Sequence, residues 1–344
     1  MVVDDSAFMR KLIGEILSKQ SDIDVVQTAR NGADALEKLE QFEVDVITLD
    51  VEMPILGGLE TLQQIMATRP IPVVMLSSVT KRGSDITMKA LSYGAVDFLP
   101  KPSGAISLDL DTIGDALVNK VRGAYQAKLM KPQVQVHLDK THLDKPYSSS
   151  PSFAGASNLV IVIGSSTGGP RALEQVFLAL PADLRAGIVV IQHMPKGFTR
   201  SFAERLNTLS HVYVKEAENG DRIENGKALI APGNFHMEVD NGKRIRLNQN
   251  PPVQFLRPNI DVTMLCLPPL FGKRMIGVIL TGMGRDGATG MAAIKQAGGL
   301  AIAQDKASST IYSMPRVIFE EGLADYVLPI DRIGESIVKL TNRF

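Results

Sequence analysis

Residues 159–170 read LVIVIGSSTGGP, and this stretch decides the fold of the second half of the chain. Its first six residues form an uncharged, mostly aliphatic run of the length expected for a strand buried on both faces. The glycine-rich segment that follows permits a sharp turn, and Pro170 is favoured in the first turn of a helix. The stretch therefore predicts a strand, a tight turn and a helix over about 171–180, which together begin an α/β unit.

Similar strand and helix patterns alternate through the rest of the second half. Strands are predicted at 188–193, 275–281 and 301–304, with helices at 199–210 and 287–297. Such alternation is typical of a doubly wound, mostly parallel sheet. Between 212 and 250, short strand-like pieces are separated by Asn-Gly pairs at Asn219, Asn225 and Asn241, which favour hairpins. We therefore predict a doubly wound α/β domain over 158–344 with an antiparallel hairpin region.

The first hundred residues predict a second sheet. Strands are expected at 24–29, 44–50, 72–78 and 97–101, and helices at 6–19, 31–41, 56–68, 84–94 and 110–129. Only three residues precede Asp4, so the first strand is expected to be truncated. These elements predict a flavodoxin-like (βα)5 domain over 1–129. A linker over 130–157, rich in Ser, Pro, Lys and Asp, would join the two domains.

Composition limits the class of protein. Of the 344 residues, 44% are hydrophobic and 22% charged, which is enough apolar material for two globular cores. Cys266 is the only cysteine, which excludes an intramolecular disulfide and zinc sites with several cysteine ligands. No apolar run is long enough for a transmembrane helix, and the N-terminus MVVDDSAFMRK lacks a signal-peptide pattern. A cytoplasmic protein without membrane insertion is expected.

The charges are distributed unevenly between the two predicted domains. Residues 1–102 carry 10 basic and 15 acidic residues, whereas residues 158–344 carry 21 basic and 17 acidic ones. This small basic excess in the second domain falls short of the concentrated basic surface typical of nucleic-acid-binding domains. No nucleic-acid partner is therefore expected.

Acidic residues gather where strands of the first domain end. Asp4 and Asp5 follow the first strand, and Asp50 ends another. Because the carboxyl ends of parallel strands meet at one edge of a sheet, the three carboxylates are expected to converge there. A Mg²⁺ ion would relieve their mutual repulsion, since it prefers carboxylate, carbonyl and water ligands. Ser77 and Lys101 lie at the ends of two further strands, where a hydroxyl and an ammonium can hold phosphoryl oxygens.

The first domain resembles the receiver domain of response regulators. The matches are VVDDS at 2–6, LDVEMP at 49–54, LSS at 76–78 and FLPKP at 98–102. The resemblance implies phosphorylation of Asp50 by a chemotaxis histidine kinase. It implies Mg²⁺ ligands at Asp4, Asp5, Asp50 and the backbone carbonyl of Glu52. It also implies that Ser77 and Lys101 sense the phosphoryl group, and that Phe98 is the aromatic residue whose rotamer responds to it.

The glycine-rich turn of the second domain contains the pattern G-x-S-x-G, with Ser166 as its central serine. A sharp turn between strand and helix exposes such a serine, and the helix N-terminus favours negative charge that develops beside it. The segment is not a Walker A loop, which ends in Gly-Lys-Ser/Thr, and it lacks the G-x-G-x-x-G spacing of dinucleotide-binding loops. We interpret Ser166 as a candidate nucleophile.

A serine nucleophile needs a general base and a group that orients the base. His193 ends the next strand of the same βαβ unit, whereas His211 follows a helix and His236 lies in a predicted loop suited to substrate contact. Asp286 follows a further strand, in the segment TGMGRDG. Ser166, His193 and Asp286 together predict a serine hydrolase. Their order along the chain differs from the Ser-Asp-His order of α/β-hydrolases, which disfavours a typical member of that class.

The second domain resembles the catalytic domain of the chemotaxis response regulator protein-glutamate methylesterases, the CheB family. The matching segments are IGSSTGGPRALEQV, VVIQHMPKGFTRSFAERL, APGNFH, RPNIDVTM, LTGMGRDGATGM and YSMP. The resemblance implies the following roles: nucleophile Ser166, base His193, orienting residue Asp286, and oxyanion contributors Met283, through its backbone N–H, and Thr167. The chain departs from the usual pattern where Ser165, Pro170 and Ser313 stand in place of alanine, threonine and glycine.

The two resemblances together cover nearly the whole chain and imply an enzyme activated by phosphorylation. It would hydrolyse glutamate γ-methyl esters on methyl-accepting chemoreceptors and deamidate specific receptor glutamines. Mg²⁺ would serve receiver phosphorylation, and the esterase reaction would need no cofactor. Two other classes are a transcription factor with a receiver and a non-enzymatic receptor adaptor. The output domain has no compact helix-turn-helix pattern and no basic stripe, which argues against the transcription factor.

Overall fold

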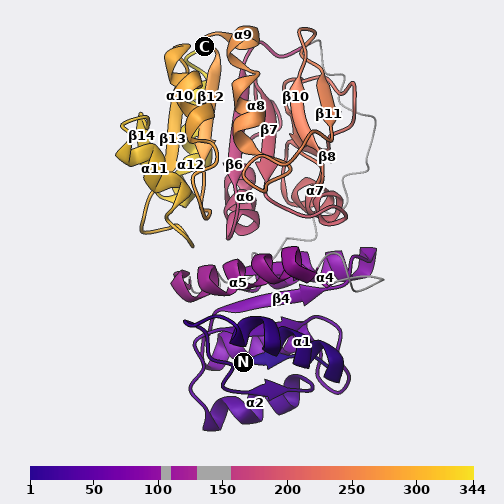
Figure 1. The fold of residues 1–344 in the computed structure, drawn as a ribbon. Coiled ribbons are helices and arrows are strands. Elements are labelled where there is room, and N and C mark those ends of the chain that lie inside the picture. Colours follow the sequence, from indigo (N-terminus) through magenta and orange to yellow (C-terminus); the bar gives the residue numbers. More distant parts are fainter. Residues whose placement is uncertain (102–109, 130–155) are drawn as a thin grey trace. The chain divides into compact units, whose positions relative to one another are not determined.

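The computed structural model describes residues 1–101, 110–129 and 156–344. The chain divides into two compact units, Met1–Met130 and Lys131–Phe344. Each unit contains a parallel sheet with helices on its faces (Figure 1). Most of the predicted linker, 130–157, lies outside the described residues. Among the described helices, none has the length and apolar character needed to cross a membrane.

The first unit holds a five-stranded parallel sheet with the strand order β2-β1-β3-β4-β5. The strands are β1 Val2–Val3, β2 Thr28–Ala29, β3 Ile47–Asp50, β4 Val73–Ser77 and β5 Asp97–Pro100. The helices are α1 Ala7–Ser18, α2 Gly32–Gln41, α3 Gly58–Thr68, α4 Lys81–Ser92 and α5 Leu110–Gln126. This strand order is that of flavodoxin-like folds, so the predicted fold of this unit is confirmed.

The strand register of the first unit brings its polar strand ends together. Strands β1, β3, β4 and β5 run parallel, with Val3 opposite Leu49 and Ser77 opposite Pro100. The residues that end or follow these strands therefore emerge at one edge of the sheet. On the sheet faces, apolar residues such as Leu17 of α1 pack into the core.

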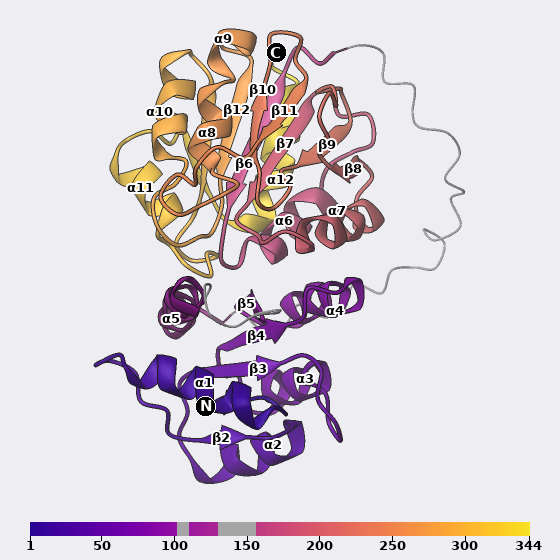
Figure 2. The same ribbon diagram turned by 45° about the vertical axis from the view of Figure 1, so that its right-hand side comes forward.

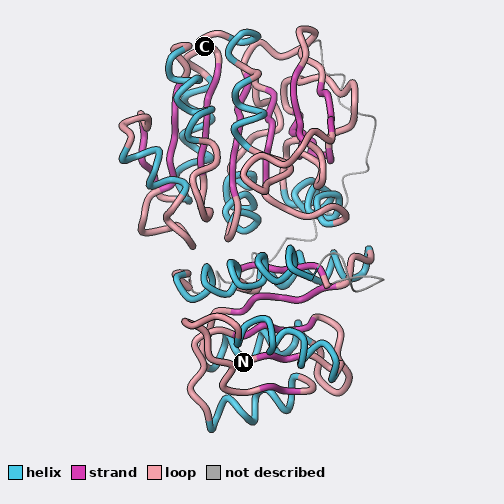
Figure 3. Tube along the Cα trace, viewed as in Figure 1, coloured by secondary structure: helices cyan, strands magenta, loops and turns pink. Residues whose placement is uncertain are grey.

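The second unit is built on a seven-stranded parallel sheet with the order β14-β13-β12-β6-β7-β9-β8 (Figure 3). Its strands are β6 Val160–Ser165, β7 Gly187–Gln192, β8 Tyr213–Glu216, β9 Lys227–Ile230, β12 Met275–Ile279, β13 Leu300–Gln304 and β14 Tyr326–Leu328. The central strands β6, β7 and β12 are buried along their whole length, which explains their continuous apolar sequence. From β6 the chain leads to β7 on one side and later to β12 on the other, so β6 ends where the strand order reverses.

Helices cover both faces of this sheet, as expected for a doubly wound fold (Figure 2). They are α6 Gly169–Leu178, α7 Phe198–Leu209, α8 Ile260–Leu265, α9 Pro268–Phe271, α10 Ala288–Gln296, α11 Met314–Glu320 and α12 Ile330–Thr341. Helix α6 packs against α7 and α12, whereas α10 packs against α8 and α11. The sequence patterns predicted no element at α8, α9, α11, α12 or β14. Helix α8 is too short for a clear apolar period, because it has only six residues.

The predicted hairpin region is confirmed at one Asn-Gly pair and wrong at the other two. The pair at Asn241 joins β10 His236–Val239 to β11 Ile245–Asn248, which are antiparallel. The pairs at Asn219 and Asn225 lie between β8 and β9, which run parallel and so cannot form a hairpin with each other. Asn-Gly supplies a residue with positive φ to many kinds of tight turn, so this dipeptide alone does not specify a hairpin.

Gly290 sets how closely α10 approaches α8. A Cβ atom at this position would lie 2.3 Å from Cβ of Met264 on α8. We expect Gly290→Ala to destabilise the second unit by about 1–3 kcal/mol, because the added methyl group would force the two helices apart. Calorimetric thermal unfolding measures this effect.

Gly14→Ala is the control for this prediction. Gly14 lies in α1, and a Cβ atom there would meet nothing within 4 Å. Replacement of this helical glycine is expected to stabilise the first unit by about 0.5–1 kcal/mol. Stabilisation by both substitutions would contradict the tight contact between α8 and α10.

Candidate active site

Ser166 lies in the turn between β6 and α6, and this turn is fixed by residues that follow β12. The backbone N–H of Ser166 donates to the carbonyl of Thr281, with an N···O distance of 3.1 Å. The Thr281 hydroxyl donates in turn to the carbonyl of Thr167 at 3.0 Å. Gly168 has a φ of 77°, and a Cβ atom there would lie 2.5 Å from Cβ of Thr310. Glycine is therefore the residue that this turn requires.

The two adjacent serines of the turn have different environments. Ser165 is fully buried, and its hydroxyl donates to Oε1 of Gln192 at 2.7 Å. Ser166 is partly exposed. Because a nucleophile must reach its substrate, this difference favours Ser166, in agreement with the sequence pattern.

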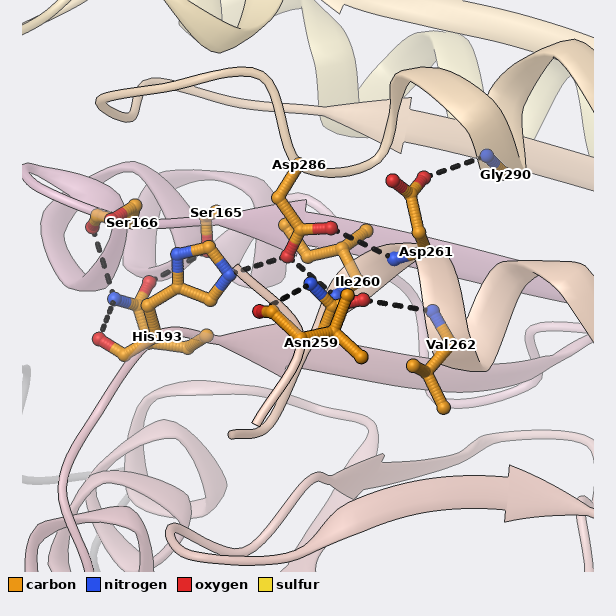
Figure 4. Close-up of polar contacts among 11 residues, drawn as sticks. Ser165, Ser166, His193, Asn259, Ile260, Asp261, Val262, Asp286 and Gly290 are labelled. Carbon is orange, nitrogen blue, oxygen red and sulfur yellow. Dashed lines mark hydrogen bonds and ion pairs between the residues drawn. The ribbon is translucent and has the colours of Figure 1, made fainter. Parts of the chain in front are cut away.

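His193 and Asp286 form a short hydrogen bond beside this turn. The distance from His193 Nε2 to Asp286 Oδ2 is 2.8 Å, and the two side chains are 8% and 1% exposed. Because an ionised carboxylate only accepts hydrogen bonds, Nε2 is the donor in this contact, and in the neutral imidazole the lone pair then lies on Nδ1. In Figure 4 Asp286 lies on one side of the imidazole and Ser166 on the other. Among the described residues no hydrogen bond joins the Ser166 hydroxyl to His193, a contact that in enzymes often tightens only when substrate binds.

The N-terminus of α8 holds the carboxylate of Asp286. The backbone N–H of Ile260 donates to Oδ2 at 2.7 Å, and that of Asp261 donates to Oδ1 at 3.0 Å (Figure 4). Asn259 caps the same helix, because its side chain accepts a hydrogen bond from the N–H of Val262 at 3.0 Å. These donors and the positive end of the helix stabilise the ionised carboxylate. Sequence reasoning missed this contact, although an asparagine before an apolar segment is a helix-start signal.

Asp261, which lies in α8, bonds to α10, the helix that follows Asp286. Its Oδ1 accepts a hydrogen bond from the backbone N–H of Gly290 in α10 at 2.7 Å. Burial raises the pKa of Asp261, and the charge of Asp286 raises it further, whereas the N–H of Gly290 lowers it. The two aspartates thus tie the beginnings of α8 and α10 to each other.

The predicted acidic cluster of the first unit is also assembled. Asp4, Asp5 and Asp50 offer carboxylate oxygens that lie within 4.8 Å of one another. Nζ of Lys101 lies 2.8 Å from Asp4 Oδ2 and 2.6 Å from Asp50 Oδ2. Beyond this ion pair, the two oxygens accept no hydrogen bond in the described part of the chain. Buried carboxylate oxygens with spare lone pairs fit a Mg²⁺ ion.

Comparisons with known proteins now decide the family. Residues 161–337 match the family model for CheB methylesterase, and residues 1–110 match that for the response regulator receiver domain. A Symbiobacterium thermophilum protein named protein-glutamate methylesterase/protein-glutamine glutaminase is 48% identical, over 98% of this chain and 96% of its own length. The chain belongs to the CheB methylesterase family.

Two further relatives agree with this assignment. A Pyrococcus horikoshii protein of the same name is 45% identical, over 98% of this chain and 92% of its own length. The crystal structure of the Thermotoga maritima CheB methylesterase catalytic domain is 44% identical, with a TM-score of 0.52, and the match covers 54% of this chain and all of that one. The predicted family, α/β fold class and enzyme class are therefore confirmed.

The residues that the CheB resemblance implied for the oxyanion site lie at or near the serine turn. Gly282 lies close to Ser166, since a Cβ atom at Gly282 would lie 2.8 Å from Cβ of Ser166. The next residue is Met283, whose backbone N–H makes no hydrogen bond within the described ranges. Thr167 is buried directly after Ser166. This arrangement leaves the N–H of Met283 available to a substrate oxygen.

The structure corrects the prediction for His236. This residue begins strand β10 rather than lying in a loop, and it is 2% exposed. Its Nε2 lies 3.1 Å from the carbonyl oxygen of Pro251. A histidine buried in this way is not suited to contact substrate. His211 is exposed after α7, as expected.

The other receiver residues implied by sequence lie in or near the same sheet edge. Ser77 is buried at the end of β4, and its hydroxyl donates to the carbonyl of Ser78 at 3.3 Å. The backbone N–H of Glu52 donates to Asp50 Oδ1 at 3.2 Å, which places its peptide beside the cluster. Phe98 is buried in β5 and packs as a core residue, with its switching role still a prediction.

The environment of Asp50 changes its acidity. Burial raises the pKa of Asp50 from its ordinary value of 3.8 to about 6; Lys101 lowers it, and the charge of Asp4 raises it. Burial lowers the pKa of Lys101, but the hydrogen bonds and charges of Asp4 and Asp50 outweigh burial and raise it overall. Burial thus makes the ionised form of Asp50 costly, and Lys101 offsets only part of this cost.

Ser166→Ala is expected to lower turnover by about 10³-fold or more, because it removes the predicted nucleophile. The measurement is methanol release from methylated receptor. Ser165→Ala is the matched control, and it should stay within about tenfold of the parent, since its buried hydroxyl contributes one hydrogen bond. An active Ser166→Ala together with an inactive Ser165→Ala would show that the wrong serine was chosen.

Asp50→Asn is expected to stabilise the first unit by about 1–3 kcal/mol at pH 7 without Mg²⁺. The pKa of Asp50 is raised from 3.8 to about 6, so ionisation of Asp50 weakens the folded state. This penalty is absent below about pH 4, develops as the pH rises, and is complete above about pH 6. Calorimetry at pH 4 and pH 7 measures the difference between the variant and the parent.

Addition of Mg²⁺ provides the control for this experiment. The ion should raise the melting temperature of the parent more than that of Asp50→Asn, because the variant lacks one negative ligand. A stability difference that is the same at both pH values would contradict the proposed cause.

Proposed function

We propose that this chain hydrolyses γ-methyl esters of glutamate on methyl-accepting chemoreceptors, and deamidates specific receptor glutamines, by a Ser-His-Asp mechanism. The observation that carries the proposal is the 2.8 Å hydrogen bond between His193 and Asp286 beside the turn of Ser166. The name shared by the relatives supports the choice of substrate.

In this mechanism the oxygen of Ser166 attacks the ester carbonyl carbon while Nδ1 of His193 accepts the hydroxyl proton. Asp286 holds the proton on Nε2 and stabilises the imidazolium that forms. The negative charge on the substrate oxygen is stabilised by the N–H of Met283 and by the turn at Thr167.

The acyl-enzyme then forms and breaks down. His193 returns its proton to the methoxy group, the bond to that group breaks, and methanol leaves. Water attacks the acyl carbon and gives one proton to His193, and Ser166 departs with that proton. The glutamate carboxylic acid that remains releases the second proton of the water to solvent and becomes a carboxylate. A glutamine side chain follows the same course with ammonia as the leaving group. No cofactor takes part in these steps.

The receiver unit is proposed to control this activity through phosphorylation of Asp50 by a chemotaxis histidine kinase. The residues that would hold Mg²⁺ are Asp4, Asp5, Asp50 and the carbonyl of Glu52. The ion would neutralise carboxylate and phosphoryl charge. Once Asp50 carries a phosphoryl group, Lys101 and the Ser77 hydroxyl can bind its oxygens, and Phe98 is proposed to change its rotamer in response. Such an enzyme would work in the cytoplasm, with receptor and kinase as partners and no nucleic acid.

A phosphodonor is expected to raise methanol release by the full chain by about fivefold or more, as typical couplings between sites do. Asp50→Asn should show no response, because it lacks the phosphoacceptor carboxylate. Both proteins are assayed on methylated receptor with acetyl phosphate and Mg²⁺. Absence of methanol release in every condition would contradict the proposal and favour a receptor adaptor or a transcription factor.

A further inference from the structure

Gln192 is the last residue of β7, and it pairs in register with Ser165, the last residue of β6. The residues that follow them are Ser166 and His193, which lie just beyond the ends of the two strands. The last backbone hydrogen bond of this ladder runs from the N–H of His193 to the carbonyl of Ser165 at 3.0 Å. The register of two parallel strands therefore sets the proposed nucleophile and base side by side.

Beyond that last backbone hydrogen bond, the side chain of Gln192 connects the two segments that leave the strands. Its Nε2 donates to the carbonyl of Ser166 at 3.0 Å and to the carbonyl of His193 at 3.1 Å. Both protons of the amide group are used, so one side chain connects the proposed nucleophile to the proposed base.

Ser165 determines which way this amide faces. Its hydroxyl donates to Oε1 of Gln192 at 2.7 Å, and the two residues are 0% and 2% exposed. A flipped amide would place its oxygen against two carbonyl oxygens, which cannot donate to it. The amide oxygen lies against the backbone of Gly169, since a Cβ atom at that position would lie 2.1 Å from Oε1.

We propose that Gln192 is a positioning residue of the esterase reaction, which keeps Ser166 and His193 at a reactive separation, and that Ser165 locks its amide in place. The proposal rests on the proposed roles of Ser166 and His193.

Loss of this connection should affect the reaction step rather than substrate binding. Gln192 is buried and does not face solvent, so a bound substrate would not touch it. A displacement of about 1 Å between reacting groups costs about 100-fold in rate. The expected signature is a lower kcat with an unchanged KM.

The test compares Gln192→Met, Ser165→Ala and the double variant with the parent full-length chain, by steady-state methanol release from methylated receptor. Methionine keeps the unbranched shape and removes the amide. Gln192→Met should lower kcat by about 10–100-fold and leave KM within about twofold. Ser165→Ala should lower kcat by about 2–10-fold, the value of one hydrogen bond. In the Gln192→Met background, Ser165→Ala should cause no further loss, because it acts through the amide.

Several outcomes would overturn the inference. These are an unchanged kcat in Gln192→Met, a change confined to KM, or losses that multiply fully in the double variant. Thermal unfolding identifies any variant whose second unit fails to fold, and Ser165→Ala still tests the inference if Gln192→Met does not fold. Ser166→Ala, assayed in parallel, distinguishes failure of this inference from failure of the proposed mechanism. If it is inactive while Gln192→Met is fully active, this inference fails and the proposed mechanism stands, whereas an active Ser166→Ala refutes the mechanism itself.

Discussion

The parallel pairing of β6 with β7 and β12 is the constraint on which the site in the second unit depends. Neighbouring strands lie about 5 Å apart, so residues that follow their carboxyl ends begin as neighbours. The register places Gly164 opposite Ile279 and Ser165 opposite Gln192. A slip of one residue would turn each side chain to the other face of the sheet. Side-chain packing on both buried faces opposes such a slip, since each face would have to be repacked.

Strand register alone does not place the carboxylate of Asp286. That task falls to α8, whose first two backbone N–H groups bond to it, and to the close packing of α8 on α10. Gly290 permits this packing, and its N–H bonds to Asp261. The contacts that stabilise this part of the fold are therefore the same contacts that hold the proposed orienting residue.

The two units use one edge geometry to give two aspartates different chemistry. Asp286 accepts hydrogen bonds from two backbone N–H groups and from His193, so its ionised form is well supported. Asp50 accepts one backbone N–H and shares Lys101 with Asp4, and burial raises its pKa to about 6. The first arrangement surrounds the carboxylate with fixed hydrogen-bond donors. In the second, burial makes the ionised carboxylate costly, and a bound cation would lower that cost.

The sequence by itself determined the α/β class, the two units and the residues at the strand ends, including Ser166, His193 and Asp50. Strand–helix alternation and the glycine-rich serine turn are local patterns, and parallel strands bring their ends together without further information. Only the tertiary structure decided that α8 holds Asp286, that His236 is buried in β10, and that Gln192 joins the two strand ends. These contacts link residues 15 to 27 positions apart, and no local pattern records which distant N–H or carbonyl a buried polar side chain will meet.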